Sequence, residues 1–165
     1  KAWESNRARA ELQRENFLRY WRAAKQRGAT PKVLAKYGGS HIVRGLSQTA
    51  VYDLGTLLPE IAALEGDRSF SMLIVPGAGT SVAGLNPSTW TYEPRPADGG
   101  YLAGLGPIMS AAHEDTFTLI DLAALRPVVG MSGKDVDKEL FRTVHGFDML
   151  LIMSGSNPSG ELQHD

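Results

Sequence analysis

The stretch Lys32-Val-Leu-Ala-Lys-Tyr-Gly-Gly-Ser-His41 carries the clearest indication of a fold in this sequence. Its first six residues predict a short interior strand, and the pair Gly38-Gly39 predicts a tight turn at the C-terminal end of that strand. His41 follows the turn. Because ligands of open α/β sheets gather beyond the C-terminal ends of strands, this stretch predicts both a strand and a functional position.

Helical patterns flank this stretch on both sides. Upstream, residues 3–27 place apolar side chains at spacings of three, four and seven, which predicts a long amphipathic helix that ends at Gly28 and Pro31. Downstream, residues 52–64 predict a second helix with leucine and isoleucine along one side. The order helix, strand, helix is typical of α/β folds.

The rest of the sequence continues this alternation. A segment rich in Gly, Pro, Ser, Thr and Asn at residues 77–100 predicts a long irregular loop. The other predicted elements are strands at 70–75, 117–122 and 147–153 and short helices at 101–112 and 135–143. We therefore expect a single α/β segment, residues 1–165, with a mostly parallel sheet of about four strands and helices on its faces.

Composition narrows the classes of function. The 165 residues suffice for one domain core, and the absence of cysteine excludes disulfides, thiolate metal ligands and a cysteine nucleophile. The 17 Lys and Arg nearly balance the 18 Asp and Glu, so total charge does not predict binding to nucleic acid or to an anionic membrane surface. No apolar run approaches the roughly 20 residues that span a bilayer. The expected partner is a small-molecule ligand, and neither compartment nor cofactor follows from the sequence.

The N-terminal end of the sequence is unusual. The sequence begins at Lys1 without an initiator Met and enters a helical pattern with no cap before it. Charged residues stand where a signal peptide needs an apolar stretch. This beginning predicts that the 165 residues are the C-terminal part of a larger domain, with part of any active site upstream of Lys1.

The glycine-bounded run at residues 38–45 is the main candidate site. It places the imidazole of His41 and the guanidinium of Arg44 three residues apart. The first can act as a base or a ligand, and the second can hold an anion. Gly38 and Gly39 let the backbone turn tightly and leave amide groups free to face a negative ligand. In the alternative interpretation, His41 caps the next segment and Arg44 is a solvated surface charge.

Arginines of the first predicted helix are further candidates. Arg7 and Arg14 lie seven residues apart and close to the apolar stripe, so at least one is expected to be drawn toward the core side, where it needs a partner. Arg9 and Asn16 share another face, again seven apart. The alternative for the arginines is snorkelling, in which the aliphatic stem packs and the charged head reaches water.

Other polar residues form weaker patterns. Asp121 ends a predicted strand, where aspartate is commonly the cap or turn residue before the next element. The run Ala112-His-Glu-Asp115 lacks the second histidine of a helical zinc motif, so no metal site is predicted. The run Gly77-Ala-Gly-Thr-Ser81 misses both the serine-hydrolase elbow and the phosphate-loop fingerprints.

Several pieces of the sequence, taken in order, are similar to one family. Arg9-Ala-Glu-Leu-Gln-Arg-Glu-Asn16 lies on a predicted helix, Gly38-Gly-Ser-His41 follows a predicted strand, and Asp53-Leu-Gly55 begins the next helix. The segments 118–122 and 147–152 follow. Together they resemble the C-terminal half of the erythromycin esterase family and of the related Tiki, TraB and ChaN proteins. The helix looks like the Arg-Asp-x-x-Met-Ala-x-Asn helix of that family, and the turn is similar to its Gly-x-x-His form.

The resemblance implies a hydrolase, with two alternatives. In the hydrolase, His41 orients or polarises the substrate or water, while Arg9 and Arg44 stabilise developing negative charge. In a ChaN-like binding protein, His41 contacts haem and the arginines hold its propionates; in a scaffold the crevice has no activity. The family also carries its proposed general base on an N-terminal Gly-Glu-x-His strand, which would precede Lys1. The predicted catalytic residues are His41 and Arg9, and the predicted ligand-binding residues are Arg44, Gly38, Gly39 and Arg7.

Overall fold

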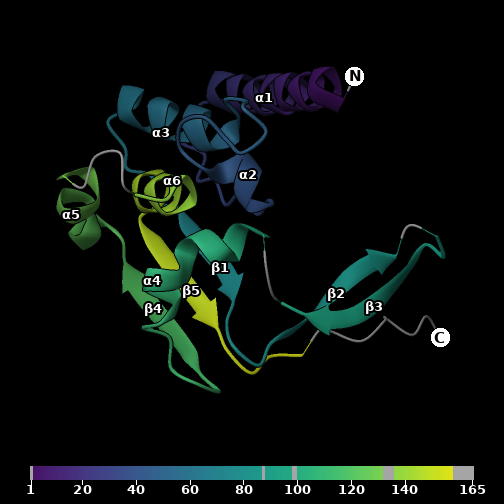
Figure 1. Ribbon diagram of the computed structural model, residues 1–165. Helices are drawn as coiled ribbons and strands as arrows, with labels where there is room; N and C mark the ends of the chain where they lie inside the picture. The colour runs from purple at the N-terminus through teal and green to yellow at the C-terminus, as the bar shows by residue number, and fades with distance from the viewer. Residues whose placement is uncertain (1, 87, 98–99, 132–135, 158–165) are drawn as a thin grey trace. The chain divides into compact units, whose positions relative to one another are not determined.

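The computed structural model describes residues 2–86, 88–97, 100–131 and 136–157, and the chain divides into two compact units. The first unit comprises residues 1–71 and 145–147, and the second comprises residues 72–144 and 148–165. The first is mainly helical, whereas the second contains the strands (Figure 1). Among the described residues, no helix combines the length and the apolar character that a membrane crossing needs.

Three helices shape the first unit: α1 (Ala2–Gln26), α2 (Gly39–Ile42) and α3 (Leu54–Leu64). α1 has the predicted amphipathic character, since Ala10 is buried and the rings of Phe17 and Trp21 stack with centroids 5.9 Å apart. The helix is followed by Gly28, whose φ of 75° is readily adopted only by glycine. Leu54 and Leu57 of α3 contribute the buried apolar face of the second predicted helix.

The second unit is built on a three-stranded mixed sheet. Its strands β1 (Met72–Pro76), β4 (Phe117–Asp121) and β5 (Met149–Met153) are ordered β1-β5-β4. β5 pairs parallel to β1 and antiparallel to β4. The expected mostly parallel sheet of about four strands is therefore wrong, although the α/β class is confirmed.

The direction of β4 has a local cause. The backbone N–H of Leu122 donates to the carbonyl oxygen of Asp148 at 3.0 Å, so the chain leaves β4 and enters β5 at the same end of the sheet. The connecting residues include the turn η2 (Ala123–Leu125) and the helices α5 (Arg126–Met131) and α6 (Lys138–Gly146). This connection starts and finishes at the same end of the sheet and does not cross to the opposite end. β4 and β5 are therefore antiparallel.

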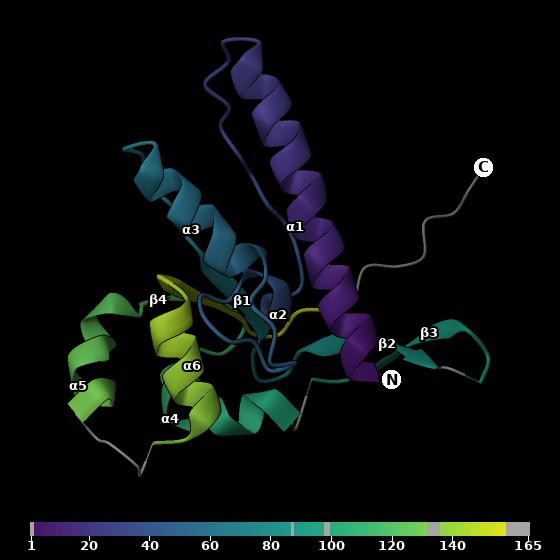
Figure 2. The ribbon, with the colours of Figure 1, turned by 90° about the horizontal axis from the view of Figure 1, so that it is seen from above.

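The two faces of this sheet differ in exposure. Leu73, Val75, Leu150 and Ile152 point to one face and are buried. The 3-10 turn η1 (Gly100–Leu105) leads into α4 (Gly106–Met109), which lies with α6 on one side of the sheet (Figures 1 and 2). The register places a second apolar set on the other face, where Ile74, Phe117 and Leu119 are 58%, 63% and 54% exposed. Within the described residues, helices therefore cover one face of the sheet and not both.

The prediction of a long irregular loop at residues 77–100 is also wrong. Its described part contains an antiparallel hairpin of β2 (Ser81–Asn86) and β3 (Thr91–Pro96). Proline has no backbone N–H and therefore disfavours a paired strand. In β3, however, Pro94 and Pro96 are two residues apart, so their nitrogens point to the same edge of the strand. The pairing with β2 then uses the other edge. The two prolines thus allow β3 to pair with β2 and disfavour a further strand at its other edge.

The strand predicted at Val33 to Tyr37 does not form. The segment has no strand partner among the described residues, and it runs without regular structure from the end of α1 to α2. Val33 is 49% exposed and Leu34 is 97% exposed, so the apolar character that predicted an interior strand is not buried. Composition identified a β-forming segment, but strand formation also requires a neighbouring edge.

Candidate functional site

A histidine and a carboxylate meet in the first unit. Nδ1 of His41 lies 2.6 Å from Oδ2 of Asp53. The His41 side chain is 30% exposed, whereas the Asp53 side chain is only 4% exposed. One partner is therefore held inside the unit while the other reaches the surface, which is the arrangement of an oriented, accessible imidazole.

Local backbone structure presents His41 at this position. Gly38 is extended, with φ of −61° and ψ of 147°, and its carbonyl oxygen accepts a hydrogen bond from the N–H of His41 at 2.9 Å. The single turn of α2 then ends at Val43, which is buried. The tight turn predicted at the glycine pair is thus present as the start of a short helix. His41 is thus partly exposed to solvent, while Val43 at the end of the same turn is buried.

Helix capping fixes Asp53. The residue stands at the N-cap of α3, and its Oδ1 accepts a hydrogen bond from the N–H of Leu54 at 2.7 Å. Capping by aspartate satisfies a free amide at a helix start and places negative charge where the helix dipole favours it. One oxygen serves the helix and the other serves His41, so the carboxylate has little freedom to rotate.

Close backbone contact joins α2 to α3 directly beneath this pair. A Cβ placed on Gly55 would lie 2.2 Å from the carbonyl carbon of Ile42 and 2.4 Å from the oxygen of Val43. Only glycine permits this approach. The distance between His41 and Asp53 is consequently set by packing of the main chain and not only by their own hydrogen bond.

The hydrogen bond determines which ring nitrogen is available. An ionised carboxylate only accepts hydrogen bonds, so Nδ1 of His41 must carry the proton that it shares with Asp53. In neutral imidazole, Nε2 is then left with a lone pair. Such a nitrogen can take a proton from water or bind a metal ion, and the carboxylate stabilises the positive charge that results.

The arginines predicted for the site have contacts of their own. Arg7 pairs with Glu11 at 2.9 Å, and Arg9 donates to Asn6, in both cases within α1. The backbone N–H of Arg44 donates to the carbonyl oxygen of Gly146 at 3.1 Å. All three lie in the same unit as His41. No hydrogen bond to His41 is found for Arg7 or Arg9 among the described residues, so a ligand shared with His41 stays a prediction.

Arg14 of α1 contacts the residue that precedes Asp53. Its Nη1 donates to the carbonyl oxygen of Tyr52 at 3.3 Å, one residue before Asp53. The side chain is half-buried. This contact answers the expectation that Arg7 or Arg14 would be drawn inward and need a partner: the partner is a backbone carbonyl, and the arginine ties α1 to the start of α3.

The described residues contain no group of three or more His, Asp and Glu side chains that could hold a metal ion. Asp121 accepts a hydrogen bond from the N–H of Ala123 at 2.9 Å, which is the role of a turn residue. His113 is exposed, and its backbone N–H donates to Oγ1 of Thr118. These residues therefore do not compete with His41 as a site.

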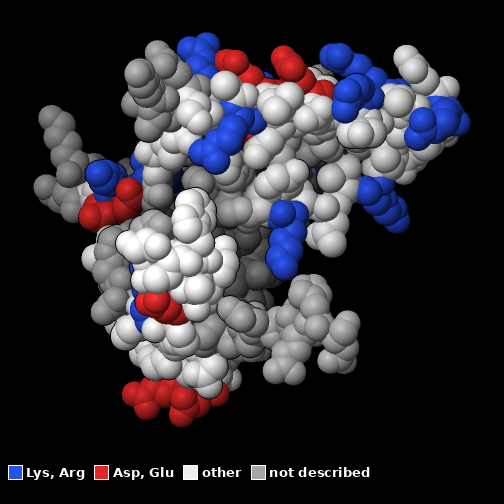
Figure 3. Space-filling model, turned by 90° about the vertical axis from the view of Figure 1, so that its right-hand side faces the viewer, with Lys and Arg blue, Asp and Glu red and all other residues white. Residues whose placement is uncertain are grey.

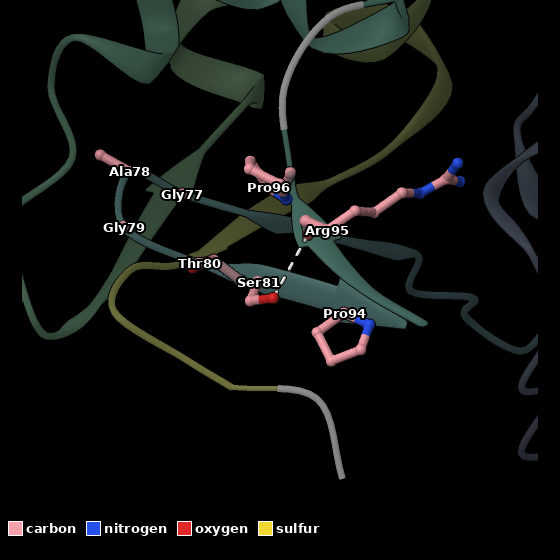
Figure 4. A pocket seen from close by; sticks show the side chains of 9 residues that line it. Gly77, Ala78, Gly79, Thr80, Ser81, Pro94, Arg95 and Pro96 are labelled. Atoms are coloured by element: carbon pink, nitrogen blue, oxygen red, sulfur yellow. Dashed lines mark hydrogen bonds between the residues drawn. The ribbon is translucent and has the colours of Figure 1, made fainter. Parts of the chain in front are cut away.

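A shallow pocket of about 450 Å³ lies in the second unit, between the turn at residues 77–81 and residues 94–97 (Figure 4). Its hydroxyl groups are engaged, because Thr80 donates to the carbonyl of Met153 at 2.6 Å and Ser81 donates to that of Arg95 at 3.4 Å. Figure 4 shows the Arg95 side chain extending away from the glycine turn. The pocket is therefore a weaker candidate for a functional site than His41 and Asp53.

Comparison with known proteins does not extend the resemblance seen in the sequence. No protein-family model, no curated protein and no solved structure matches this chain. The relation to the erythromycin esterase, Tiki, TraB and ChaN group remains a prediction. The interpretation of the site therefore depends on the geometry of His41 and Asp53.

Asp53 is the member of the site that the sequence did not predict. Its position before an apolar helical pattern predicts the start of a helix and nothing more. Twelve residues separate it from His41. Pairing across that distance depends on the close contact at Gly55, and no pattern of residue types encodes such a contact directly.

Proposed function

We propose that this protein is a hydrolase in which His41 and Asp53 form the proton-transfer pair. The observation that supports this function is the 2.6 Å contact between the accessible imidazole and the buried carboxylate. In this role, Nε2 of His41 takes a proton from water as its oxygen attacks the carbonyl carbon of an ester or amide. Asp53 stabilises the resulting imidazolium, which then gives the proton to the leaving group.

The arginines have a supporting role in this proposal. Attack on a carbonyl creates negative charge on its oxygen, and a guanidinium can stabilise that charge. Arg9 and Arg44 are the residues that the family resemblance assigns to this role, with Arg7, Gly38 and Gly39 as further ligand contacts. Their place in the same unit as His41 is compatible with the assignment.

A binding function without catalysis is the second candidate. A histidine that donates from Nδ1 to a carboxylate is the usual arrangement for a metal-binding imidazole, since the carboxylate fixes the tautomer and leaves Nε2 for the metal. His41 would then be an axial or nearby contact of haem, and the arginines would hold its propionates. The ring of Tyr37, whose centroid lies 6.3 Å from that of His41, adds an aromatic surface beside this position.

Two assays separate these functions. Hydrolysis of p-nitrophenyl acetate and butyrate should be saturable, and His41→Asn should lower kcat/KM by about 10²-fold or more, the usual contribution of a general base. His113→Asn is the matched control, because it removes an exposed histidine that can hydrolyse these esters nonspecifically. Turnover that survives His41→Asn contradicts the hydrolase.

Haem titration completes the comparison. A Soret shift that is lost in His41→Asn and kept in His113→Asn, with no saturable ester turnover, supports the binding function instead. If the wild-type chain shows neither turnover nor a Soret shift, both functions fail and the scaffold is left.

A further inference from the structure

Charge is unevenly distributed along the chain. The segment from Asn16 to Tyr52 holds seven of the 17 Lys and Arg residues and none of the 18 Asp and Glu residues. The near-zero net charge of the whole chain therefore conceals a strongly cationic segment. The seven residues are Arg19, Arg22, Lys25, Arg27, Lys32, Lys36 and Arg44.

Most of this charge lies on one stretch of the first unit, residues 19–37, which we call the basic surface. It comprises the C-terminal part of α1 and the segment after it, which turns at Gly28 and runs back toward α2 (Figure 2). Its six Lys and Arg side chains are all exposed. Figure 3 shows basic side chains more numerous than acidic ones over the upper part of the molecule, where α1 lies in Figure 1.

Little of this charge is neutralised within the protein. Lys25 pairs with Glu65, and the guanidinium of Arg19 lies 5.1 Å from the centre of the Tyr20 ring. Among the described residues, no acidic partner is found for Arg22, Arg27, Lys32 or Lys36. Like charges gathered in this way repel one another, and an anionic partner removes that repulsion.

Exposed apolar side chains are interspersed with these charges. Leu34 is 97% exposed and Val33 is 49% exposed, side by side between Lys32 and Lys36. Tyr20 and Tyr37 are 69% and 46% exposed. A fully exposed leucine is not unusual by itself, but aliphatic and aromatic side chains within a cationic surface are the combination found on proteins that bind at a membrane interface.

We propose that the basic surface docks on an anionic lipid membrane. Lys and Arg meet the lipid head groups, while Val33, Leu34 and the tyrosines enter the interface between head groups and acyl chains. Nucleic acid would satisfy the same positive charge, but it offers two adjacent aliphatic side chains no comparable apolar environment. This inference is independent of the hydrolase, because residues 19–37 contain neither His41 nor Asp53.

Vesicle co-sedimentation of the full chain tests the proposal. We expect binding to vesicles of phosphatidylcholine with about 30% phosphatidylglycerol, no binding to phosphatidylcholine alone, and weakening as salt increases. The triple variant R22Q/R27Q/K32Q should bind at least tenfold more weakly. The control R68Q/R95Q/K138Q removes the same number of exposed positive charges outside the basic surface, and should bind like the wild type.

Two further measurements make the test specific. Leu34→Ser keeps every charge and should still weaken binding, with circular dichroism confirming that each variant is folded. Equal loss in both triple variants would mean that only net charge matters and would overturn the proposal, as would full binding by Leu34→Ser. Binding of the wild type to a single-stranded or duplex oligonucleotide without binding to anionic vesicles would also overturn it, in favour of nucleic acid.

Discussion

The α carbon of Gly55 lies so close to the carbonyl group of Ile42 that a Cβ on it would be 2.2 Å from the carbonyl carbon. The atoms in the way belong to the main chain, which cannot rotate aside as a side chain can. Gly55→Ala must therefore displace α2 from α3, and we expect it to destabilise the protein by roughly 1–3 kcal/mol. Urea unfolding measures this change.

Gly106→Ala is the control for this substitution. Gly106 begins the short helix α4, and a Cβ there meets nothing within 4 Å. Since alanine favours helices over glycine, this variant should be as stable as the wild type or slightly more stable. Equal stability of the two variants would show that α2 and α3 are not in close contact.

The tautomer of His41 is a second testable property. Because Asp53 accepts the hydrogen bond, the neutral ring should carry its proton on Nδ1, and nitrogen-15 chemical shifts of the imidazole report this directly. Asp53→Ala removes the acceptor, so the proton should move to Nε2. Asp53→Asn retains an acceptor oxygen and an N-cap residue, and should keep the wild-type tautomer. A proton on Nε2 in the wild type would contradict the pair.

Loss of His41 should affect stability through its partner. For an ordinary surface histidine, the change to alanine would fall within about 0.5 kcal/mol. Here His41→Ala leaves one oxygen of a buried carboxylate without its partner, so the expected loss is roughly 1–3 kcal/mol. His41→Asn can place an amide N–H near the position of Nδ1 and should recover most of that loss. Equal stability of both variants would argue that the hydrogen bond contributes little.

The difference between the two faces of the sheet can be measured by truncating one residue on each. Ile152 of β5 is fully buried, so Ile152→Ala should cost roughly 2–5 kcal/mol. Ile74 of β1 is 58% exposed on the opposite face, and Ile74→Ala should cost far less. The midpoints of thermal unfolding, Tm, of the two variants should therefore differ widely. Similar losses would mean that the second face is also covered.

Strong local signals in the sequence predicted part of this fold. The apolar runs at residues 117–122 and 147–153 correspond to β4 and β5 within a residue or two of the expected bounds. Residues 52–64 closely match α3. The segment from Val33 to Tyr37 has similar composition, but it pairs with no strand among the described residues and has no regular structure. Composition measures the tendency to form a strand, whereas pairing depends on residues far away in the sequence.

The candidate site shows the same division. His41 and its glycine turn were visible as a motif, because residue types and spacing within ten positions carried the information. The partner was not visible, because Asp53 reads as an ordinary helix cap and its second oxygen is assigned only by tertiary packing. The charge of residues 16–52 was available in the sequence, but it was hidden by averaging over the whole chain.

The central position of β5 has a consequence for how the second unit is made. Met72 of β1 pairs with Met149, and Phe117 of β4 pairs with Met153, so both neighbouring strands pair with the last of the described strands. During synthesis from the N-terminus, β1 and β4 emerge from the ribosome without a partner, and their apolar side chains are open to chaperones and to aggregation. Closure of the sheet requires contacts distant in sequence, which makes it a slow step of folding.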